Sequence, residues 1–214
     1  MNTDRLIDML SANLEPVNPS QLGGTLLLAM VSSGAAAFGL MLATVGPRPD
    51  LESIAHLEWA GAKLFFAFSI AFAGTPFLIK LMRPGRENET KRALLFFPLA
   101  ATVALTLLML LLGREAWGTP LGARAISPAR CLCCIPFFAA IPMTALIWAL
   151  RQGAPTLLRL CGAIAGVVAG GLGAAAYAVS CSSDTVPFIA IWYSAAIALC
   201  GLIGARLGLR FLRW

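Results

Sequence analysis

Long apolar stretches without internal acidic residues dominate the pattern of hydrophobic and polar positions along this chain. Six such stretches lie at 22–45, 61–82, 93–113, 131–150, 157–180 and 186–209. A helix needs roughly 20 mostly apolar residues to cross the hydrocarbon core of a bilayer, so each stretch predicts one spanning helix. A β-barrel would alternate apolar and polar residues in each segment, and these stretches do not alternate. The pattern predicts an all-α integral membrane protein, a six-helix transmembrane bundle.

Composition supports this class. The 214 residues are 59% hydrophobic and only 12% charged, and the mean hydropathy is +0.82, which excludes an ordinary soluble domain. Residues 1–20 carry Asp4, Asp8 and Glu15 before any apolar stretch begins, a pattern that excludes a signal peptide. We expect two parts: a short amino-terminal segment, residues 1–20, and a six-span domain, residues 21–214.

The distribution of Lys and Arg predicts the orientation of the spans. Eleven of the sixteen basic residues fall on one side: Arg5, Lys80, Arg83, Arg86, Lys91, Arg92, Arg151, Arg159, Arg206, Arg210 and Arg213. Basic residues favour the cytoplasmic side, so both termini are expected in the cytoplasm; in a bacterium, the spans would lie in the inner membrane. Lys63, near the outer end of the second stretch, is expected to extend toward the lipid headgroups. The net charge of +6 then needs no nucleic-acid partner, because aromatic residues do not interleave with the basic ones.

Glycines at four-residue spacing predict close helix packing, because small residues let helix backbones approach one another in lipid. The fifth and sixth stretches carry these series: Gly162, Gly166 and Gly170, then Gly204 and Gly208. Packing within one bundle is favoured over self-association. The longer series indicates a central position for the fifth helix.

Candidate catalytic residues are scarce. No span carries an acidic residue or a histidine near its middle, and the single histidine, His56, is expected in the first external loop. No Ser/His/Asp set, carboxylate pair or phosphate-binding loop can be assembled. The sequence therefore predicts that the protein is not an enzyme and holds no cofactor.

Cysteine is the remaining chemistry-bearing residue, and the topology sorts the six of them. Cys131, Cys133 and Cys134 begin the fourth span at its external end, and Cys181 follows the fifth span on the same side. The external side of a bacterial inner membrane is oxidising. Two outcomes stay open: a disulfide between Cys131 and Cys181, or capture of a thiophilic metal ion by Cys131, Cys181 and Cys134. Cys161 and Cys200 lie inside spans, where a packing role is expected.

The amino-terminal segment predicts a short helix over residues 3–14, with Thr3 as its N-cap and acidic residues in its first turn. Leu6, Leu10 and Leu14 share one face. Helices that lie on membranes usually have basic polar faces, whereas this one is acidic, so a protein partner is favoured over the bilayer surface. The candidate partner-binding residues are Asp4, Leu6, Ile7, Asp8, Leu10 and Leu14.

These residues, in this order, resemble a known family. The chain is similar to the NrsF family of six-span membrane anti-sigma factors. The positions that carry the resemblance are Thr3-Asp4, Leu6-Ile7, Leu10, Pro16-Val17, Cys131, Ile135-Pro136, Pro142, Arg151, Gly153-Ala154-Pro155-Thr156, Gly162, Gly166, Gly170, Tyr177, Cys181, Pro187-Phe188, Trp192-Tyr193 and Leu212-Arg213-Trp214.

The resemblance implies a partner and a signal. Members of the family hold an extracytoplasmic-function sigma factor of the SigF kind at the membrane and release it under heavy-metal or oxidative stress. Cys131 and Cys181 match the family's external cysteines, with a transient metal ion as one possible ligand. This chain has Ser180 where members often carry a histidine, which favours a sensor built on thiols alone. The alternatives are a thiol-lined heavy-metal carrier and a membrane thiol oxidoreductase.

Overall fold

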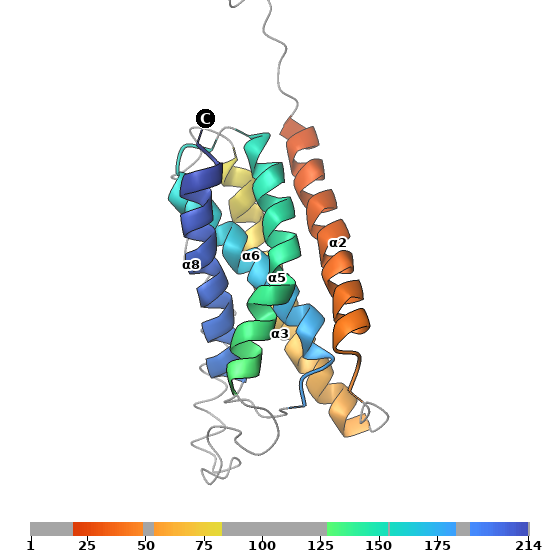
Figure 1. Ribbon diagram of the computed structural model, residues 1–214. Helices are drawn as coiled ribbons and strands as arrows, with labels where there is room; N and C mark the ends of the chain where they lie inside the picture. Colours follow the sequence, from red (N-terminus) through yellow and green to blue (C-terminus); the bar gives the residue numbers. More distant parts are fainter. Residues whose placement is uncertain (1–18, 49–53, 83–127, 154, 183–188, 214) are drawn as a thin grey trace, which may run out of the picture.

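The computed structural model contains five long helices in the part of the chain that it describes (Figure 1). The described residues are 19–48, 54–82, 128–153, 155–182 and 189–213. The helices are α2 (Pro19–Thr44), α3 (Ile54–Leu81), α5 (Pro128–Arg151), α6 (Leu158–Ala178) and α8 (Ser194–Phe211), the last preceded by a π-helical turn, η3 (Ile189–Tyr193). Each contains or completes a stretch long and apolar enough to cross a membrane. The all-α prediction is therefore confirmed for the described residues.

Five of the six predicted spans coincide with these helices. The predicted span at 93–113 and the predicted amino-terminal helix at 3–14 lie outside the described residues. One boundary was wrong: α3 begins at Ile54, so His56 belongs to a helix and not to a loop. A helix can extend beyond its apolar stretch because its backbone hydrogen bonds do not depend on side-chain polarity.

The helices run so that their ends gather at two opposite ends of the bundle (Figure 1). At the "terminus end", α2 and α6 begin and α3, α5 and α8 finish. At the opposite "cysteine end", α3, α5 and η3 begin and α2 and α6 finish. The ends of α3 and α5 adjoin, because a Cβ placed on Gly153 would lie 3.1 Å from the carbonyl oxygen of Met82. Consequently α3 and α5 run in the same direction.

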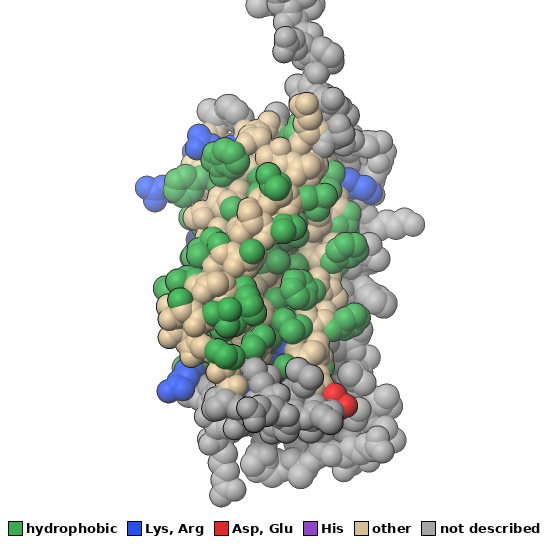
Figure 2. All heavy atoms as spheres, turned by 90° about the vertical axis from the view of Figure 1, so that its right-hand side faces the viewer, with side chains coloured by type: hydrophobic (Ala, Val, Ile, Leu, Met, Phe, Trp, Pro, Cys, Tyr) green, Lys and Arg blue, Asp and Glu red, His purple; other side chains and the backbone are tan. Residues whose placement is uncertain are grey.

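Basic side chains lie near these two ends, and exposed hydrophobic side chains lie between them. The basic residues near the terminus end are Lys80, Arg151, Arg159, Arg206, Arg210 and Arg213, and those near the cysteine end are Arg48, Lys63 and Arg130. Figure 2 shows hydrophobic side chains over the middle of one face, with Lys and Arg side chains toward its ends. Phe65 and Phe72 of α3 are 78% and 82% exposed. Such large exposed aromatic side chains suit a lipid-facing surface.

Helix α6 lies at the centre, the position that its glycine series indicates. It contacts α2, α3, α5 and α8. In its spanning stretch 78% of the residues are buried, against 22% in α2. The helix can be surrounded in this way because it presents small residues in several directions.

The contact between α6 and α8 is made backbone to backbone. A Cβ placed on Gly162 would overlap the carbonyl oxygen of Gly204 and lie 2.8 Å from the Cα of Gly208. A Cβ on Gly204 would in turn lie 2.8 Å from the Cα of Gly166. Gly170 continues the contact, because a Cβ there would lie 3.2 Å from the α8 backbone. Only glycine permits this separation.

Two further glycines of α6 serve its other neighbours. A Cβ on Gly171 would lie 2.9 Å from the carbonyl oxygen of Ala67 in α3, and one on Gly173 would lie 2.8 Å from that of Ile135 in α5. The four-residue series in the sequence did not include these two positions, because each faces a different helix.

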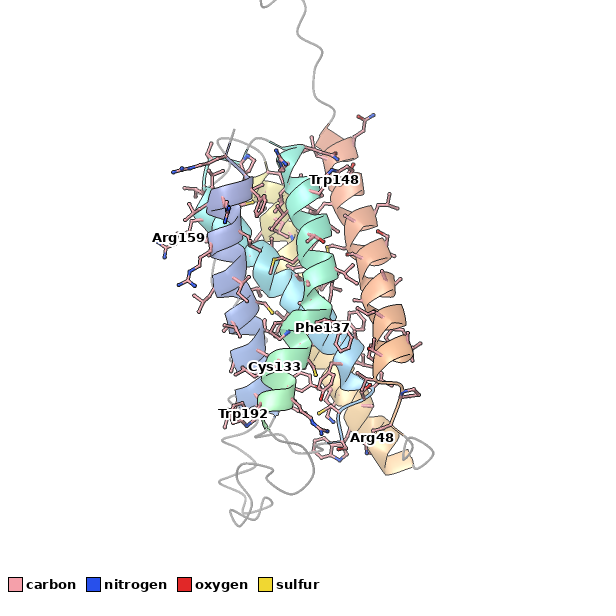
Figure 3. The ribbon with its side chains drawn as sticks, viewed as in Figure 1. Arg48, Cys133, Phe137, Trp148, Arg159 and Trp192 are labelled. Atoms are coloured by element: carbon pink, nitrogen blue, oxygen red, sulfur yellow. The ribbon has the colours of Figure 1, made fainter. Side chains whose placement is uncertain are left out.

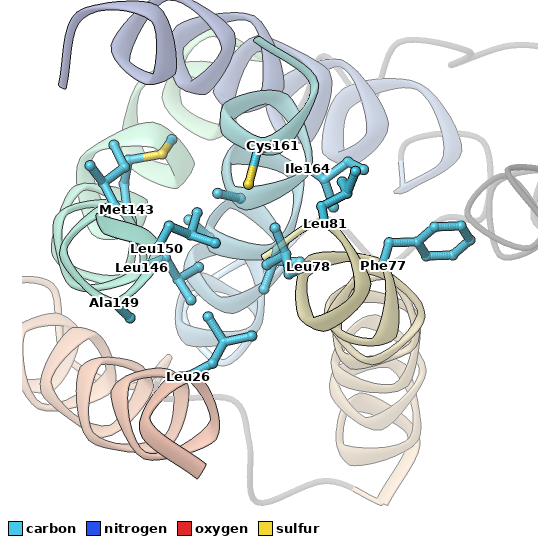
Figure 4. Packing of buried hydrophobic residues seen from close by; sticks show 14 of the residues in the cluster. Leu26, Phe77, Leu78, Leu81, Met143, Leu146, Ala149, Leu150, Cys161 and Ile164 are labelled. Carbon is cyan, nitrogen blue, oxygen red and sulfur yellow. The ribbon is translucent and has the colours of Figure 1, made fainter. Parts of the chain in front are cut away.

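Side chains fill the remaining interior in two clusters stacked along the bundle. The "terminus-end cluster" contains Leu26, Leu78, Leu146 and Cys161, and Figure 4 shows these side chains converging from four helices. The "cysteine-end cluster" contains Cys131, Cys181, Phe138, Tyr177 and Tyr193. Cys131 and Cys181 thus lie in one cluster, and Cys161 and Cys200 lie in the other.

Replacing Gly204 by alanine should destabilise the bundle. The added Cβ would overlap the backbone of α6, and overpacking of this kind typically costs about 1–3 kcal/mol. Thermal unfolding in detergent should show a lowered midpoint. Gly39→Ala is the matched control, because no atom lies within 4 Å of a Cβ placed there, and it should leave the midpoint unchanged or slightly raised. Equal midpoints for the two variants would contradict the packing described for α6 and α8.

Candidate functional site

Cys131 and Cys181 lie together in the cysteine-end cluster. Cys131 is in the first turn of α5 and Cys181 lies just after the end of α6. Both side chains are fully buried, with 0% exposure. Their side chains lie close enough to interact, and both are free thiols. The structure therefore brings together, at one end of the bundle, two cysteines from distant parts of the sequence.

The end of α6 turns Cys181 into the bundle. The amides of Ser180 and Cys181 both donate to the carbonyl oxygen of Tyr177, at 3.0 and 3.2 Å, so the chain stays folded against the last turn of the helix. The Ser180 hydroxyl donates to the carbonyl oxygen of Gly46 at 2.6 Å. Ser180 thus joins the end of α6 to the segment that follows α2.

Two tyrosines lie next to the thiol pair. The Tyr177 side chain lies close to Cys131, and its ring stacks on Phe138. Tyr193 is 0% exposed, and its hydroxyl lies near Cys181 without a hydrogen bond of good geometry to any described atom. Tyr193 ends the π-helical turn η3, and such turns occur frequently at functional sites.

Two buried cationic side chains hold the backbone of Cys181. The Lys63 ammonium, Nζ, donates to the carbonyl oxygen of Cys181 at 2.8 Å, and the Arg48 guanidinium donates to the same oxygen at 3.0 Å. Lys63 is 0% exposed and Arg48 is 8% exposed. Figure 3 shows Arg48 at the cysteine end, where Cys133 and Trp192 are also labelled.

The inward position of Lys63 corrects the prediction that it extends toward lipid headgroups. The last carbonyl groups of a helix lack partners within the helix and carry the negative end of its dipole. The chain just past α6 therefore offers a better partner for an ammonium group than the surrounding lipid does. The sequence did contain a signal, because Lys63 is a lone charge near the outer end of an apolar stretch, but the pattern could not show which way the side chain points.

The other four cysteines occupy different surroundings. Cys134, predicted as a third sensor thiol, is partly exposed and packs against the cysteine-end cluster, and Cys133 is exposed. Cys161 and Cys200 are buried in the terminus-end cluster. Within the described ranges, no three His, Cys, Asp or Glu side chains converge in a way that would hold a metal ion. The thiol pair is therefore a site with two sulfur atoms, and Cys134 lies at its edge.

The predicted partner-binding residues, from Asp4 to Leu14, lie outside the described residues. The basic segment from Arg83 to Arg92, which follows α3, does so as well. The structure does locate the start of α2, which continues from the amino-terminal segment, at the terminus end.

The chemistry available to the site is that of a vicinal dithiol. Two thiols in contact can be oxidised to a disulfide, which brings the sulfur atoms to about 2.05 Å. They can also lose their protons to a soft metal ion that binds both sulfurs. Either reaction changes the distance between the two sulfur atoms.

Fold and site together define an all-helical protein with membrane-length helices and a buried dithiol at one end. Comparison with known proteins identifies its family. The family model "Negative regulator of sigma F", NrsF, matches residues 10–214. The chain therefore belongs to the NrsF family.

Two curated relatives cover the full length of the chain. The anti-sigma-F factor NrsF of Caulobacter vibrioides is 33% identical over 230 aligned positions, and the probable anti-sigma-F factor NrsF of Azospira oryzae is 30% identical over 225. Each alignment covers 100% of both chains. No solved structure matches the chain significantly.

Proposed function

We propose that this protein is a membrane-bound anti-sigma factor that holds an extracytoplasmic-function sigma factor of the F kind and releases it when its thiol pair is modified. The observation that carries the proposal is the full-length match to anti-sigma-F factors. The contact between the Cys131 and Cys181 side chains supports the sensing part. The names of the relatives describe regulators, in agreement with a role other than catalysis.

A count of crossings supports six spans. Helix α3 finishes at the terminus end and α5 begins at the cysteine end, so the chain between Leu81 and Pro128 passes from one end of the bundle to the other. In a membrane this requires an odd number of crossings. The apolar stretch at 93–113 is long enough for one crossing, and it is the only such stretch in that interval.

The distribution of basic residues supports an orientation in which the capture segment lies in the cytoplasm, beside the transcription machinery. Six of the nine described basic residues lie near the terminus end, which the positive-inside rule assigns to the cytoplasm of a bacterial inner membrane. The amino-terminal segment leads into α2 at that end. Its Leu6, Leu10 and Leu14 face would dock on the sigma factor, with Asp4 and Asp8 at its polar edge.

The cysteine end then faces the oxidising side of the membrane, where two kinds of signal reach the thiols. A hydroperoxide oxidises one thiol to a sulfenic acid and is itself reduced, and the second thiol then displaces water to form the disulfide. Two electrons pass to the peroxide, and its oxygen atoms leave as water or alcohol. A thiophilic metal ion instead binds both thiolates and releases two protons.

A nearly complete switch needs a large but chemically attainable free-energy difference. Shifting a population from 1:99 to 99:1 requires about 5.5 kcal/mol of differential stabilisation. For a two-electron couple this corresponds to roughly 120 mV between the dithiol potentials of the holding and releasing states. A disulfide can supply this difference.

The two alternative functions find less support in the described residues. A thiol oxidoreductase that passes electrons onward typically needs a second cysteine pair in communication with the first, yet Cys161 and Cys200 belong to the terminus-end cluster. A metal carrier needs ligands along a path, and no group of three metal-binding side chains occurs in the described ranges.

A pull-down tests the proposed function. The full-length chain, tagged at its carboxyl terminus and purified in mild detergent, should retain a sigma factor of the F kind under reducing conditions. Addition of hydrogen peroxide should release that sigma factor. A chain that never retains it would contradict the capture role, and a complex that persists after both thiols are oxidised would contradict the thiol mechanism.

A further inference from the structure

We propose that Lys63, assisted by Arg48, is the positioning residue that couples the state of the thiol pair to helix α3, and through α3 to the cytoplasmic end of the bundle. The inference rests on the proposed function. It assigns a role to a cation that neither the sequence pattern nor the thiol chemistry required.

The first support is the burial of Lys63. An ammonium group with 0% exposure loses its hydration, which is costly unless strong hydrogen bonds replace it. The bond of 2.8 Å to the carbonyl oxygen of Cys181 is such a replacement, because hydrogen bonds from charged donors are roughly twice as strong as neutral ones. The backbone of the sensing residue is thus attached directly to α3.

The second support is the number of attachments at the same place. Arg48 donates to the Cys181 carbonyl oxygen from the segment after α2, and the Ser180 hydroxyl donates to Gly46 of that segment. The backbone amide of Arg48 also donates to the carbonyl oxygen of Val179, at 3.4 Å. The end of α6 therefore cannot move without moving the neighbouring ends of α2 and α3.

The third support is the close packing of α3 against α6. Lys63, Ala67 and Ala71 occupy one face of α3 at four-residue spacing, and all are buried. At Ala67 and Ala71 this face touches α6 closely, because a Cβ on Gly171 would lie 2.9 Å from the Ala67 carbonyl oxygen and 3.2 Å from the Ala71 Cβ. This backbone contact serves as a pivot, with the Lys63 bond on its outer side and the rest of α3 on its inner side.

Modification of the thiols would move helix α3 through its Lys63 bond. Forming a disulfide draws Cys181 toward Cys131 on α5, and its carbonyl oxygen moves with it. Lys63 transmits the displacement to the outer end of α3, which then tilts about its contact with Gly171. The inner end of α3 adjoins Gly153 at Met82, so the tilt reaches the terminus end, where the amino-terminal segment joins α2.

Lys63→Met tests this role, because it keeps the length of the side chain and removes the donor. The measured quantity is the fraction of sigma factor released divided by the fraction of protein with oxidised thiols, both determined on purified complexes treated with hydrogen peroxide. We expect this coupling ratio to fall about tenfold, since a bond from a charged donor is being lost. The thiols themselves should still oxidise. Lys63→Arg should restore the ratio to that of the parent protein.

Lys80→Met is the matched control, with the same substitution near the other end of the same helix, and it should couple as the parent does. A parental ratio in Lys63→Met would overturn the inference. If Lys63→Met does not accumulate in membranes, Arg48→Met decides: a ratio lowered at least threefold supports the inference, and a parental ratio overturns it. Parent protein that oxidises fully and keeps its sigma factor would instead refute the proposed function.

Discussion

Replacing Cys181 by serine should leave the sigma factor permanently held. Serine is nearly isosteric with cysteine, and the bonds of 2.8 and 3.0 Å from Lys63 and Arg48 go to the backbone carbonyl group of residue 181, which the substitution keeps. Fold and capture should therefore survive while the disulfide becomes impossible. We expect the induction of sigma-F-dependent transcription by peroxide or by a thiophilic metal to fall to the uninduced level, as measured with a reporter gene.

The same result is expected for Cys131→Ser, because each thiol needs the other. Cys133→Ser is the matched control, because Cys133 lies on α5 two positions after Cys131 and is exposed. Its replacement should leave induction at the parental level. Basal transcription should remain low in all three variants. Induction that persists in both Cys131→Ser and Cys181→Ser would exclude the thiol pair as the sensor.

Deleting residues 2–14 should have the opposite effect and free the sigma factor constitutively. The deletion removes the whole predicted capture helix, whereas the described bundle begins only at Pro19, so the membrane domain should still assemble. Sigma-F-dependent transcription without any inducer should rise to at least the fully induced level. An immunoblot of the membrane fraction would verify that the shortened protein accumulates.

Point substitutions refine this second test. Leu6→Glu together with Leu10→Glu places charges on the apolar face of the predicted helix, and should reproduce the effect of the deletion. Ala12→Glu is the matched control, because Ala12 lies on the side of the predicted helix opposite Leu6, Leu10 and Leu14. Unchanged basal transcription in the deletion variant would refute the capture role of the segment.

Much of the fold was predictable because a bilayer imposes requirements that can be recognised directly in the sequence. A span must be long and uncharged, and its flanking basic residues favour one side. The predictions for the stretches at 22–45 and 157–180 therefore came close to the bounds of α2 and α6. The placement of Cys131 and Cys181 at one end follows from the same count of crossings.

The interior of the site was not predictable because it depends on how the helices rotate against one another. A lysine near the end of an apolar stretch extends toward headgroups in most settings, yet Lys63 turns inward to the end of α6. Tyr177 and Tyr193 carried part of the family resemblance, but their position beside the thiols emerges only from the packing of three separate helices. The packing roles of Gly171 and Gly173 were not predicted, for the same reason.

The central claim is that the state of the thiol pair decides whether the sigma factor is held. The most direct measurement is a peroxide titration of membranes that contain the unmodified protein, with mass spectrometry of the Cys131–Cys181 cross-link and quantification of bound sigma factor in each sample. The account predicts that bound sigma factor falls in proportion to the cross-link and is recovered after reduction with dithiothreitol. Complete cross-linking with the sigma factor still bound, or release without any cross-link, would contradict it.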